Sequence, residues 1–160
     1  MIRLIAAVDT KRGISKQGVQ PWSIPDDEKY FSRLTKGNGG AVLIGSITYS
    51  MLKGPLADRH TFVLSHDKED IPGVTVVDNL EKFLDEYSNK DLWVIGGANV
   101  FDQVVALGKA DELYLTKINA DFGCNQFFPE YEQTFRLVEQ SPLHEQNGFI
   151  YTNNKLVKLQ

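Results

Sequence analysis

Short, nearly all-apolar runs constrain the fold of this chain more than any other feature of its sequence. Three of them, Ile2–Val8, Ala41–Gly45 and Leu92–Ile95, have the length and composition of strands that are covered on both faces. Further strands are predicted at 59–65 and 75–77, and helical segments at 25–35, 46–52, 80–87 and 99–107. Strands that alternate with helices predict an α/β fold with a central, mostly parallel sheet and helices on both faces.

The last third of the chain follows a different pattern. Glu112–Ile118 alternates between apolar and polar residues, and Phe135–Gln140 and Phe149–Leu159 lie around the turn residues Asn147-Gly148. We therefore expect an antiparallel pair at the C-terminal edge of the sheet. Two long connections, 9–22 and 119–130, have a size that is usually functional or mobile. At 160 residues the chain is expected to form one domain, 1–160.

Composition narrows the classes of function. The net charge of −4 argues against a basic nucleic-acid-binding surface, although it leaves room for a local basic pocket. The N-terminal apolar run is too short for a signal peptide and no stretch has the length of a membrane span, so a cytoplasmic location is expected. The single cysteine, Cys124, excludes an internal disulfide. His60, His66 and His144 lack ligand spacing, so no metal site is expected.

The stretch Gln20–Phe31 holds three consecutive carboxylates at the predicted start of a helix. Ser23 has the position of an N-cap, and the segment 36–40 ends the helix with residues that tolerate positive φ. Residues four and seven positions after Asp27 are Phe31 and Leu34, so Asp27 heads an apolar stripe. Two interpretations remain: acids in a first turn favour the helix dipole, or Asp27 is a functional carboxylate in apolar surroundings.

Two similar segments, 41–48 and 92–99, each give a strand, a glycine turn and the start of a helix. Side by side they would suit a pyrophosphate, but neither is a dinucleotide fingerprint or a P-loop, and plain βα turns also need glycine. Arg59 suits a carboxylate ligand or an exposed surface position, and Ser65-His66 suits a phosphate or a solvated turn. Trp22 and Thr116 are unremarkable in isolation, as a core anchor and a strand residue.

Together these signals resemble one family, the dihydrofolate reductases, over essentially the whole chain. The matching segments occur in the family's order: 4–7, Pro21-Trp22 with Pro25, Asp27 and Phe31, Gly45 with Thr48-Tyr49, Pro55-Leu56 with Arg59, Leu64-Ser65, 94–97, 113–116 and 128–131. The resemblance implies an eight-stranded, mostly parallel sheet with four helices. It also implies NADPH-dependent reduction of 7,8-dihydrofolate to tetrahydrofolate.

The resemblance further implies roles for individual residues. Asp27 matches the carboxylate that binds the pterin, Thr116 the threonine bonded to that carboxylate, and Trp22 the tryptophan that orders a water beside the pterin. Arg59 matches the arginine that binds the glutamate α-carboxylate. The implied catalytic residues are Asp27, Trp22 and Thr116, and the implied substrate-binding residues are Ile5, Ala6, Asp27, Glu28, Phe31, Met51, Leu52, Leu56, Arg59, Ile95 and Thr116.

Cofactor binding is implied at the two glycine turns, at the loop 9–22 and at the end of the strand 59–65. The Gly96-Gly97 turn of this family contains a cis peptide. The implied NADPH-binding residues are Ala7, Ile14, Gly18, Val19, Gly45, Ser46, Ile47, Thr48, Leu64, Ser65, His66, Ile95, Gly96, Gly97, Ala98, Asn99, Val100, Phe101 and Gln103.

The physical chemistry of these positions suits hydride transfer. The cofactor supplies the hydride, so the protein has to align donor and acceptor and help a proton arrive. A desolvated Asp27 is expected to have a raised pKa and to favour the protonated pterin, either directly or through water. The loop 9–22 is expected to be a mobile lid over the nicotinamide.

Several positions depart from the family pattern. Ser46 and Ile47 stand where many relatives have basic residues against the cofactor's phosphates, which weakens the expected preference for NADPH over NADH, with His66 supplying part of that recognition. Phe101 and Gln126 replace a tyrosine and a threonine found in relatives. Gln20 and Glu28 stand where methionine and leucine line the active site, so weaker binding of diaminopyrimidine antifolates is expected. Glu28 either desolvates on binding or stays hydrated at the rim and raises the pKa of Asp27.

Two rival functions follow from the same residues. One is another reductase on this fold, acting on a pterin or on the pyrimidine intermediate of flavin synthesis. Asp27 and Arg59 argue against it, since they match the pterin and glutamate-tail positions. The other is a catalytically silent nucleotide- or RNA-binding module, which the acidic composition disfavours. We expect a monomeric enzyme that binds dihydrofolate and antifolates and that contacts neither nucleic acid nor membrane.

Overall fold

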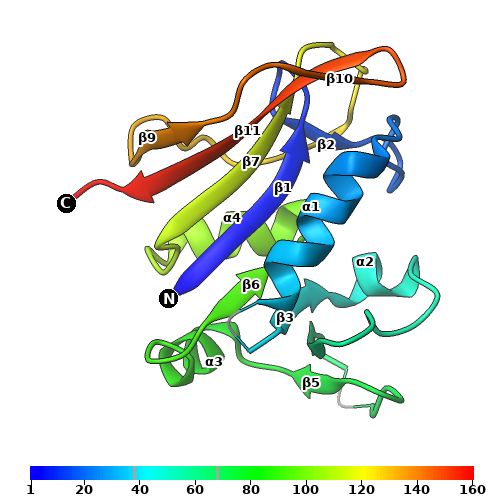
Figure 1. Ribbon diagram of the computed structural model, residues 1–160. Helices are drawn as coiled ribbons and strands as arrows, with labels where there is room; N and C mark the ends of the chain where they lie inside the picture. Colours follow the sequence, from blue (N-terminus) through cyan, green and yellow to red (C-terminus); the bar gives the residue numbers. More distant parts are fainter. Residues whose placement is uncertain (38, 68) are drawn as a thin grey trace.

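The structure is a computed structural model that describes residues 1–37, 39–67 and 69–160. Asn38, in the segment expected to end the first helix, lies outside the described residues. Nine strands form one sheet: eight follow the order β10–β11–β7–β1–β6–β3–β4–β5, and the ninth, β9, pairs with β11 (Figure 1). Their bounds are β1 Ile2–Val8, β3 Ala41–Gly45, β4 His60–Leu64, β5 Thr75–Val77, β6 Leu92–Val94, β7 Glu112–Ile118, β9 Phe135–Gln140, β10 His144–Gln146 and β11 Phe149–Lys158.

The strands β1, β3, β4, β5, β6 and β7 pair with one another in parallel. β11 is antiparallel to its neighbours β7, β9 and β10. The predicted mostly parallel sheet with an antiparallel C-terminal edge is therefore confirmed. The turn at Asn147-Gly148, with φ of 54° and 80°, connects β10 to β11, so the hairpin partner of β11 is β10 rather than the 135–140 strand alone. The predicted pairing of 135–140 with β11 is also present.

Four helices lie within the described residues: α1 Pro25–Lys36, α2 Ser46–Ser50, α3 Leu80–Glu86 and α4 Ala98–Ala106. In Figure 1, α1 crosses in front of the sheet, whereas α4 lies behind β1 and β7. The sequence places helices on both faces because successive side chains point to opposite faces of a strand and are apolar on both in the central strands. Leu4 of β1 packs in the cluster that includes α3 and α4, and Ile5 packs in the cluster that includes Phe31 and Leu34 of α1.

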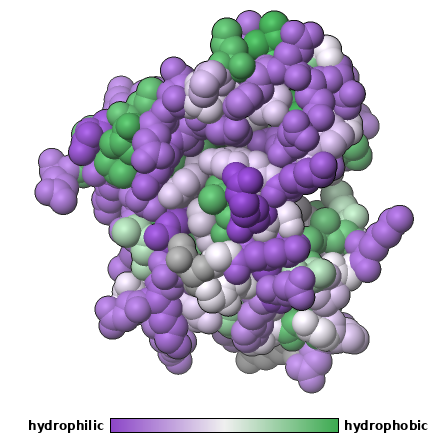
Figure 2. Space-filling view, in the orientation of Figure 1, coloured by the Kyte–Doolittle hydropathy of each residue, from purple (hydrophilic) through white to green (hydrophobic). Residues whose placement is uncertain are grey.

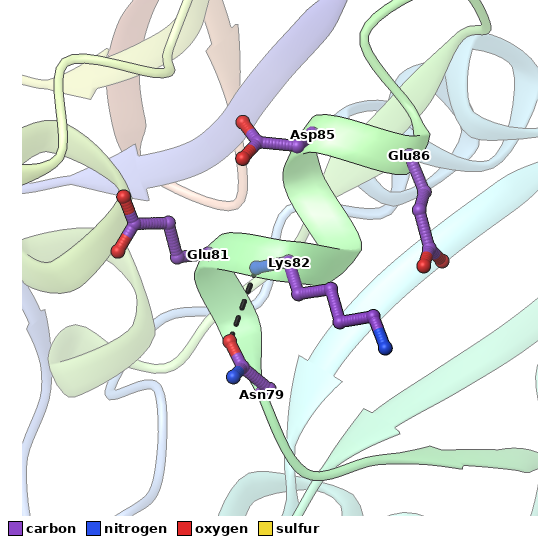
Figure 3. Close-up of a pocket in the computed structure, with 5 residues that line it drawn as sticks. All are labelled: Asn79, Glu81, Lys82, Asp85 and Glu86. Atoms are coloured by element: carbon purple, nitrogen blue, oxygen red, sulfur yellow. Dashed lines mark hydrogen bonds between the residues drawn. The ribbon is translucent and has the colours of Figure 1, made fainter.

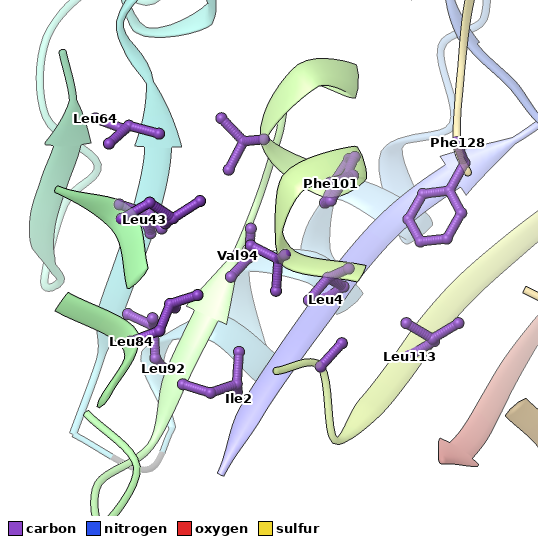
Figure 4. Packing of buried hydrophobic residues seen from close by; sticks show 14 of the residues in the cluster. Ile2, Leu4, Leu43, Leu64, Leu84, Leu92, Val94, Phe101, Leu113 and Phe128 are labelled. Carbon is purple, nitrogen blue, oxygen red and sulfur yellow. The ribbon is translucent and has the colours of Figure 1, made fainter. Parts of the chain in front are cut away.

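The core on the α3 and α4 side is the larger of the two. Figure 4 shows Leu4, Val94 and Leu113 from three adjacent strands beneath Phe101 of α4 and beside Phe128. Leu4, Val94 and Leu113 are fully buried, and the rings of Phe101 and Phe128 are 4.9 Å apart. This packing fixes the strand ends that precede the two glycine turns, since each turn follows a strand of this core.

The start of α1 differs from the expectation. Ile24, not Ser23, is the N-cap residue, and it carries no capping side chain. The exposed amide of Asp26 instead donates to Oε1 of Gln146 at 2.7 Å, and Nδ2 of Asn147 donates to the carbonyl of Ser23 at 3.0 Å. The β10–β11 hairpin therefore satisfies the first turn of α1 in place of a local cap.

The two long connections pair with each other. β2 (Gly13–Ser15) and β8 (Gln126–Phe127) form a small antiparallel sheet within segments that are predicted as loops. The carboxylate of Asp9, which is buried, accepts hydrogen bonds from the amides of Lys11, Gly13 and Phe122 at 2.9, 2.7 and 3.2 Å. One aspartate thus joins the base of the first loop to the second.

The surface in the view of Figure 2 is mainly hydrophilic, with separate hydrophobic patches. One lies over β9, where Leu137 and Val138 are exposed, and another lies over α2, where Ile47 and Met51 are exposed. No helix among the described residues is long and apolar enough to cross a membrane.

Candidate active site

A cleft of about 940 Å³ lies at the carboxyl ends of the parallel strands. Ligands bind at this edge of an open α/β sheet, because helix starts and loops gather there. Most predicted site residues line the cleft: Ile5, Ala6, Ala7, Ile14, Gly18, Val19, Trp22, Asp27, Glu28, Phe31, Ile47, Thr48, Met51, Leu52, Leu56, Ile95, Gly97, Phe101 and Thr116. Gln20 and Gln126, noted as departures, also line it.

Other lining residues were not predicted as site residues: Ser15, Gln17, Ile24, Tyr30, Ile44 and Asn125. Tyr30 lies on α1, and burial raises the pKa of its hydroxyl above the usual value. Helical spacing predicts that Asp27 heads the apolar stripe of α1. The same spacing does not distinguish Tyr30 from a residue on the exposed face of the helix.

A second, shallower depression lies over α3 and is lined by charged residues. Figure 3 shows Glu81 and Asp85 on one side of the helix and Glu86 on the other, with Oδ1 of Asn79 accepting from the amide of Lys82 at the start of the helix. The depression has no buried wall, and its carboxylates do not converge on a shared point. The cleft is therefore the candidate active site.

Asp27 lies in the first turn of α1, and its carboxylate faces β7 and β11. Oγ1 of Thr116 donates to Oδ1 of Asp27 at 2.6 Å, and Nδ2 of Asn153 donates to the same oxygen at 3.2 Å. Burial raises the pKa of Asp27 above its usual range; the two donors oppose this rise, and the negative charge of Glu28 adds to it. The cleft therefore holds a carboxyl group that binds a proton at higher pH than an exposed aspartate does.

The residues around Asp27 form a largely apolar pocket. Trp22 is buried and its ring packs 5.1 Å from Phe122, so it is both a core anchor and part of the cleft wall. Phe31 and Leu56 pack with Ile5 in the core cluster on this face. Such a pocket accepts a flat aromatic ligand and removes water from the carboxyl group.

Arg59 is not among the residues that line the cleft; Leu56, three residues earlier, does line it. Nε of Arg59 donates to the carbonyl of Ala57 at 2.9 Å, and Nη1 of Arg59 donates to Oγ1 of Thr35 at 2.8 Å. Burial lowers the pKa of the Arg59 guanidinium below the usual value. The hydrogen bonds within the described residues therefore fix the orientation of Arg59 and do not engage Nη2.

The two glycine turns lie against each other. The amide of Gly45 donates to the carbonyl of Gly96 at 2.8 Å, and the Gly96-Gly97 peptide is cis, as expected. A Cβ atom on Gly97 would lie 2.6 Å from Oγ1 of Thr48, so only glycine fits there without displacement. The paired turns bring the starts of α2 and α4 together beside the cleft.

The remaining predicted cofactor residues are not among those that line the cleft: Gly45, Ser46, Leu64, Ser65, His66, Gly96, Ala98, Asn99, Val100 and Gln103. Leu64 ends β4, the neighbour of β3, and His66 is exposed beyond it. Val100 is buried, and its Cγ2 lies 3.0 Å from where a Cβ of Gly45 would be, so its side chain belongs to the core.

The loop 9–22 covers one side of the cleft. Ser15 Oγ donates to Oε1 of Gln126, and the amide of Gln17 donates to Oδ1 of Asn125 at 2.9 Å. A Cβ atom on Gly18 would lie 2.5 Å from Cε of Met51, so the tip of the loop meets the far wall. Two side chains of the second loop thus hold the first loop over the cleft.

Glu28 lies at the rim. Its side chain is exposed although it lines the cleft, and it is adjacent to Asp27 in the sequence. The negative charge of Glu28 raises the pKa of Asp27, and the exposed carboxylate is in a position where a ligand that enters the cleft can desolvate it.

The fold and the cleft define an α/β enzyme that acts on a small molecule, with a proton-binding carboxyl group beside paired glycine turns. The sequence profile described as dihydrofolate reductase matches residues 1–158. Dihydrofolate reductase of Drosophila melanogaster is 37% identical, and the match covers 97% of this chain and 96% of the relative. That of Bacillus subtilis (strain 168) is 35% identical, covering 94% and 90%.

A solved structure of dihydrofolate reductase from Enterococcus faecalis, complexed with NADP(H) and RAB-propyl, superposes with a TM-score of 0.88. It is 27% identical in sequence, and the match covers 100% of this chain and 97% of that one. The chain belongs to the dihydrofolate reductase family. It is an NADPH-dependent oxidoreductase that reduces dihydrofolate, and the resemblance seen in the sequence is confirmed.

Proposed function

We propose that the cleft reduces 7,8-dihydrofolate to 5,6,7,8-tetrahydrofolate with Asp27 as the group that holds the pterin and brings the proton. The observation that carries this proposal is the desolvated carboxyl of Asp27, fixed through Oδ1 by Thr116 and lining a largely apolar cleft. The described hydrogen bonds leave Oδ2 to accept N–H groups of the pterin. The raised pKa lets this carboxyl group hold a proton at higher pH than an exposed aspartate does.

The walls of the cleft position the substrate. Trp22, Ile5 and Phe31 offer flat apolar surfaces to a pterin and an aminobenzoyl ring. Arg59, which Thr35 orients, binds the α-carboxylate of the glutamate tail. Ala6, Met51, Leu52 and Ile95 complete the substrate-binding set.

The chain fits NADPH at the paired glycine turns. The close approach of Gly97 to Thr48 and of Gly45 to Gly96 leaves backbone amides at the starts of α2 and α4 for a pyrophosphate. NADPH supplies the hydride when it is bound. Gly18 and Val19 of the loop 9–22 cover the nicotinamide side and exclude water.

We further propose that residues 1–160 work as one domain in a cytoplasmic monomer, with dihydrofolate, NADPH and antifolates as partners and with neither nucleic acid nor membrane. The net charge of −4 supports the absence of nucleic-acid binding. One sheet that contains both β1 and β11 supports a single domain. Sedimentation of the purified chain tests the monomer.

The loss of NADPH absorbance on addition of dihydrofolate tests the activity in the wild type, Asp27→Asn and Asp26→Asn. Asp26 is a matched control, because it is the adjacent carboxylate of the same helical turn and is exposed. We expect Asp27→Asn to lower the rate roughly 10²–10⁴-fold, as for loss of a general acid, and Asp26→Asn to retain it. No turnover by the wild type, or equal rates for both variants, would contradict the proposal.

A further inference from the structure

A second strand residue supports the carboxyl of Asp27 besides Thr116. Asn153 of β11 stands directly opposite Thr116 of β7 in the antiparallel pair. Residues opposite each other in such a pair present their side chains on the same face, here the face covered by α1. Nδ2 of Asn153 lies 2.9 Å from Oγ1 of Thr116 and 3.2 Å from Oδ1 of Asp27. Three side chains from three elements therefore meet within hydrogen-bond distance.

The direction of each bond follows from the groups available. A carboxylate only accepts, so the amide nitrogen of Asn153, rather than its oxygen, has to face Asp27. Nδ2 also donates to Oγ1 of Thr116, which directs the single hydroxyl proton of Thr116 toward Asp27 at 2.6 Å. Donors that act in series polarise one another and strengthen the final bond. Asn153 thus supports Asp27 both directly and through Thr116.

The backbone of Asn153 is fixed separately from its side chain. Its amide donates to Oγ of Ser141 at 2.9 Å, and its carbonyl accepts from the amide of Ser141 at 2.9 Å. The position of Asn153 in the sheet therefore does not depend on the bonds of its Nδ2. The backbone contacts of Asn153 and the bonds of its side chain can therefore be tested by different substitutions.

We propose that Asn153 is a positioning residue that fixes Asp27 and Thr116 in their mutual orientation and favours the ionised form of Asp27. The proposal rests on the proposed role of Asp27 in the reaction. Asn153 does not line the cleft, so it acts on the reaction only through the carboxyl group and the hydroxyl group that it contacts.

The other charged or titratable groups around Asp27 act differently. Glu28, on the same helix, raises the pKa of Asp27 through its negative charge. Tyr30 of α1 and Tyr151 of β11 also interact with Asp27, but burial raises their pKa values above the usual value of 10, so they stay neutral between pH 5 and 9. On β7, Nζ of Lys117 lies over the ring of Tyr131 instead. Asn153 and Thr116 are therefore the groups that oppose the effect of burial.

The test compares Asn153→Leu, which has a similar shape but no donor, with wild type, Ser141→Ala and Glu28→Gln. The first readout is the pH dependence of hydride transfer in a single turnover with NADPH and dihydrofolate. The second is the titration of the Asp27 carboxyl carbon by ¹³C NMR, which needs no turnover. Asn153→Ala serves if the leucine variant does not fold.

For Asn153→Leu we expect the apparent pKa to rise by roughly half to one unit in both readouts, since one charge-assisted bond to the anion is lost. That shift is a roughly three- to tenfold change in the proton-binding constant. Glu28→Gln lowers the apparent pKa of Asp27, and Ser141→Ala leaves this pKa unchanged while lowering the stability of the protein. An unchanged NMR titration in both Asn153 variants would overturn the proposal, whereas wild-type enzyme without turnover would overturn only the role of Asp27 in the reaction.

Discussion

The contact between the two glycine turns gives a prediction whose magnitude follows from the structure. Gly97 has φ of −82°, so alanine meets no left-handed backbone strain there. Its Cβ, however, would lie 2.6 Å from Oγ1 of Thr48, and the next nearest atom is Cβ of Thr48 at 3.9 Å. The whole conflict therefore involves a single hydroxyl group.

Overpacking of one atom at this distance costs roughly 1–3 kcal/mol, because the neighbour has to move. For a domain of this size, a middle value of about 2 kcal/mol lowers the Tm by roughly 4–8 °C. In Gly97→Ala/Thr48→Ala the oxygen is absent and the remaining 3.9 Å contact is ordinary. We expect the double variant to be about 1–2 kcal/mol more stable than Gly97→Ala. Such a recovery requires a favourable coupling energy between the two sites.

Equilibrium unfolding in urea of the wild type, both single variants and the double variant measures this coupling. Gly96→Ala is the matched control, because Gly96 has φ of 118° and contacts Phe101 rather than Thr48. Thr48→Ala should not rescue it. We also expect Gly97→Ala to raise the KM for NADPH more than that for dihydrofolate. Additive costs of Gly97→Ala and Thr48→Ala, without coupling, would refute the reasoning.

Three further predictions concern the charged groups around the cleft. Glu28→Leu should lower the trimethoprim inhibition constant roughly tenfold, since an exposed rim carboxylate no longer has to be desolvated by the drug; an unchanged constant would count against a role for Glu28. Because the native pKa of Asp27 is raised, its contribution to stability is present below its usual pKa of 3.8 and is lost as the pH rises through the native value. In calorimetry, Asp27→Asn should therefore have a higher Tm than the wild type at pH 7 and lose that advantage toward pH 4. A variant less stable than the wild type at pH 7 would contradict this sign. Ser46→Arg should raise the ratio of kcat/KM for NADPH to that for NADH roughly tenfold through a charge-assisted phosphate contact. An equal ratio in wild type and variant would contradict this and would indicate that His66 already supplies the recognition.

Local patterns in the sequence were sufficient for most of the elements. The strands Glu112–Ile118 and Phe135–Gln140 have the predicted bounds, and the apolar stripe behind Asp27 packs as its spacing indicated. The contact between Thr116 and Asp27 followed from the resemblance to the family and is present. These features depend on periodicity or on motifs, which are visible along the chain.

The features that were missed depend on partners distant in the sequence. Ser23 fits the N-cap pattern, but Gln146, 120 residues beyond Asp26, satisfies the first turn instead. Asn153 looks like an ordinary strand residue until β11 brings it opposite Thr116. β2 and β8 are too short to show a periodicity and exist because the two loops pair. Periodicity reports which face of an element is apolar, not which polar group will meet it.

The dependence of α1 on the β10–β11 hairpin affects the order in which the parts of the active site form during synthesis. The contacts that orient Asp27 span 89 residues to Thr116 and 126 residues to Asn153, and the contact at the helix start spans 120 residues to Gln146. A nascent chain can pair β4 with β3, β3 with β6 and β6 with β1, and so shape part of the cleft, while the carboxyl group is still unsupported. Catalytic competence therefore arrives with the last strand, because β11 completes the surroundings of an acid that was translated more than a hundred residues earlier.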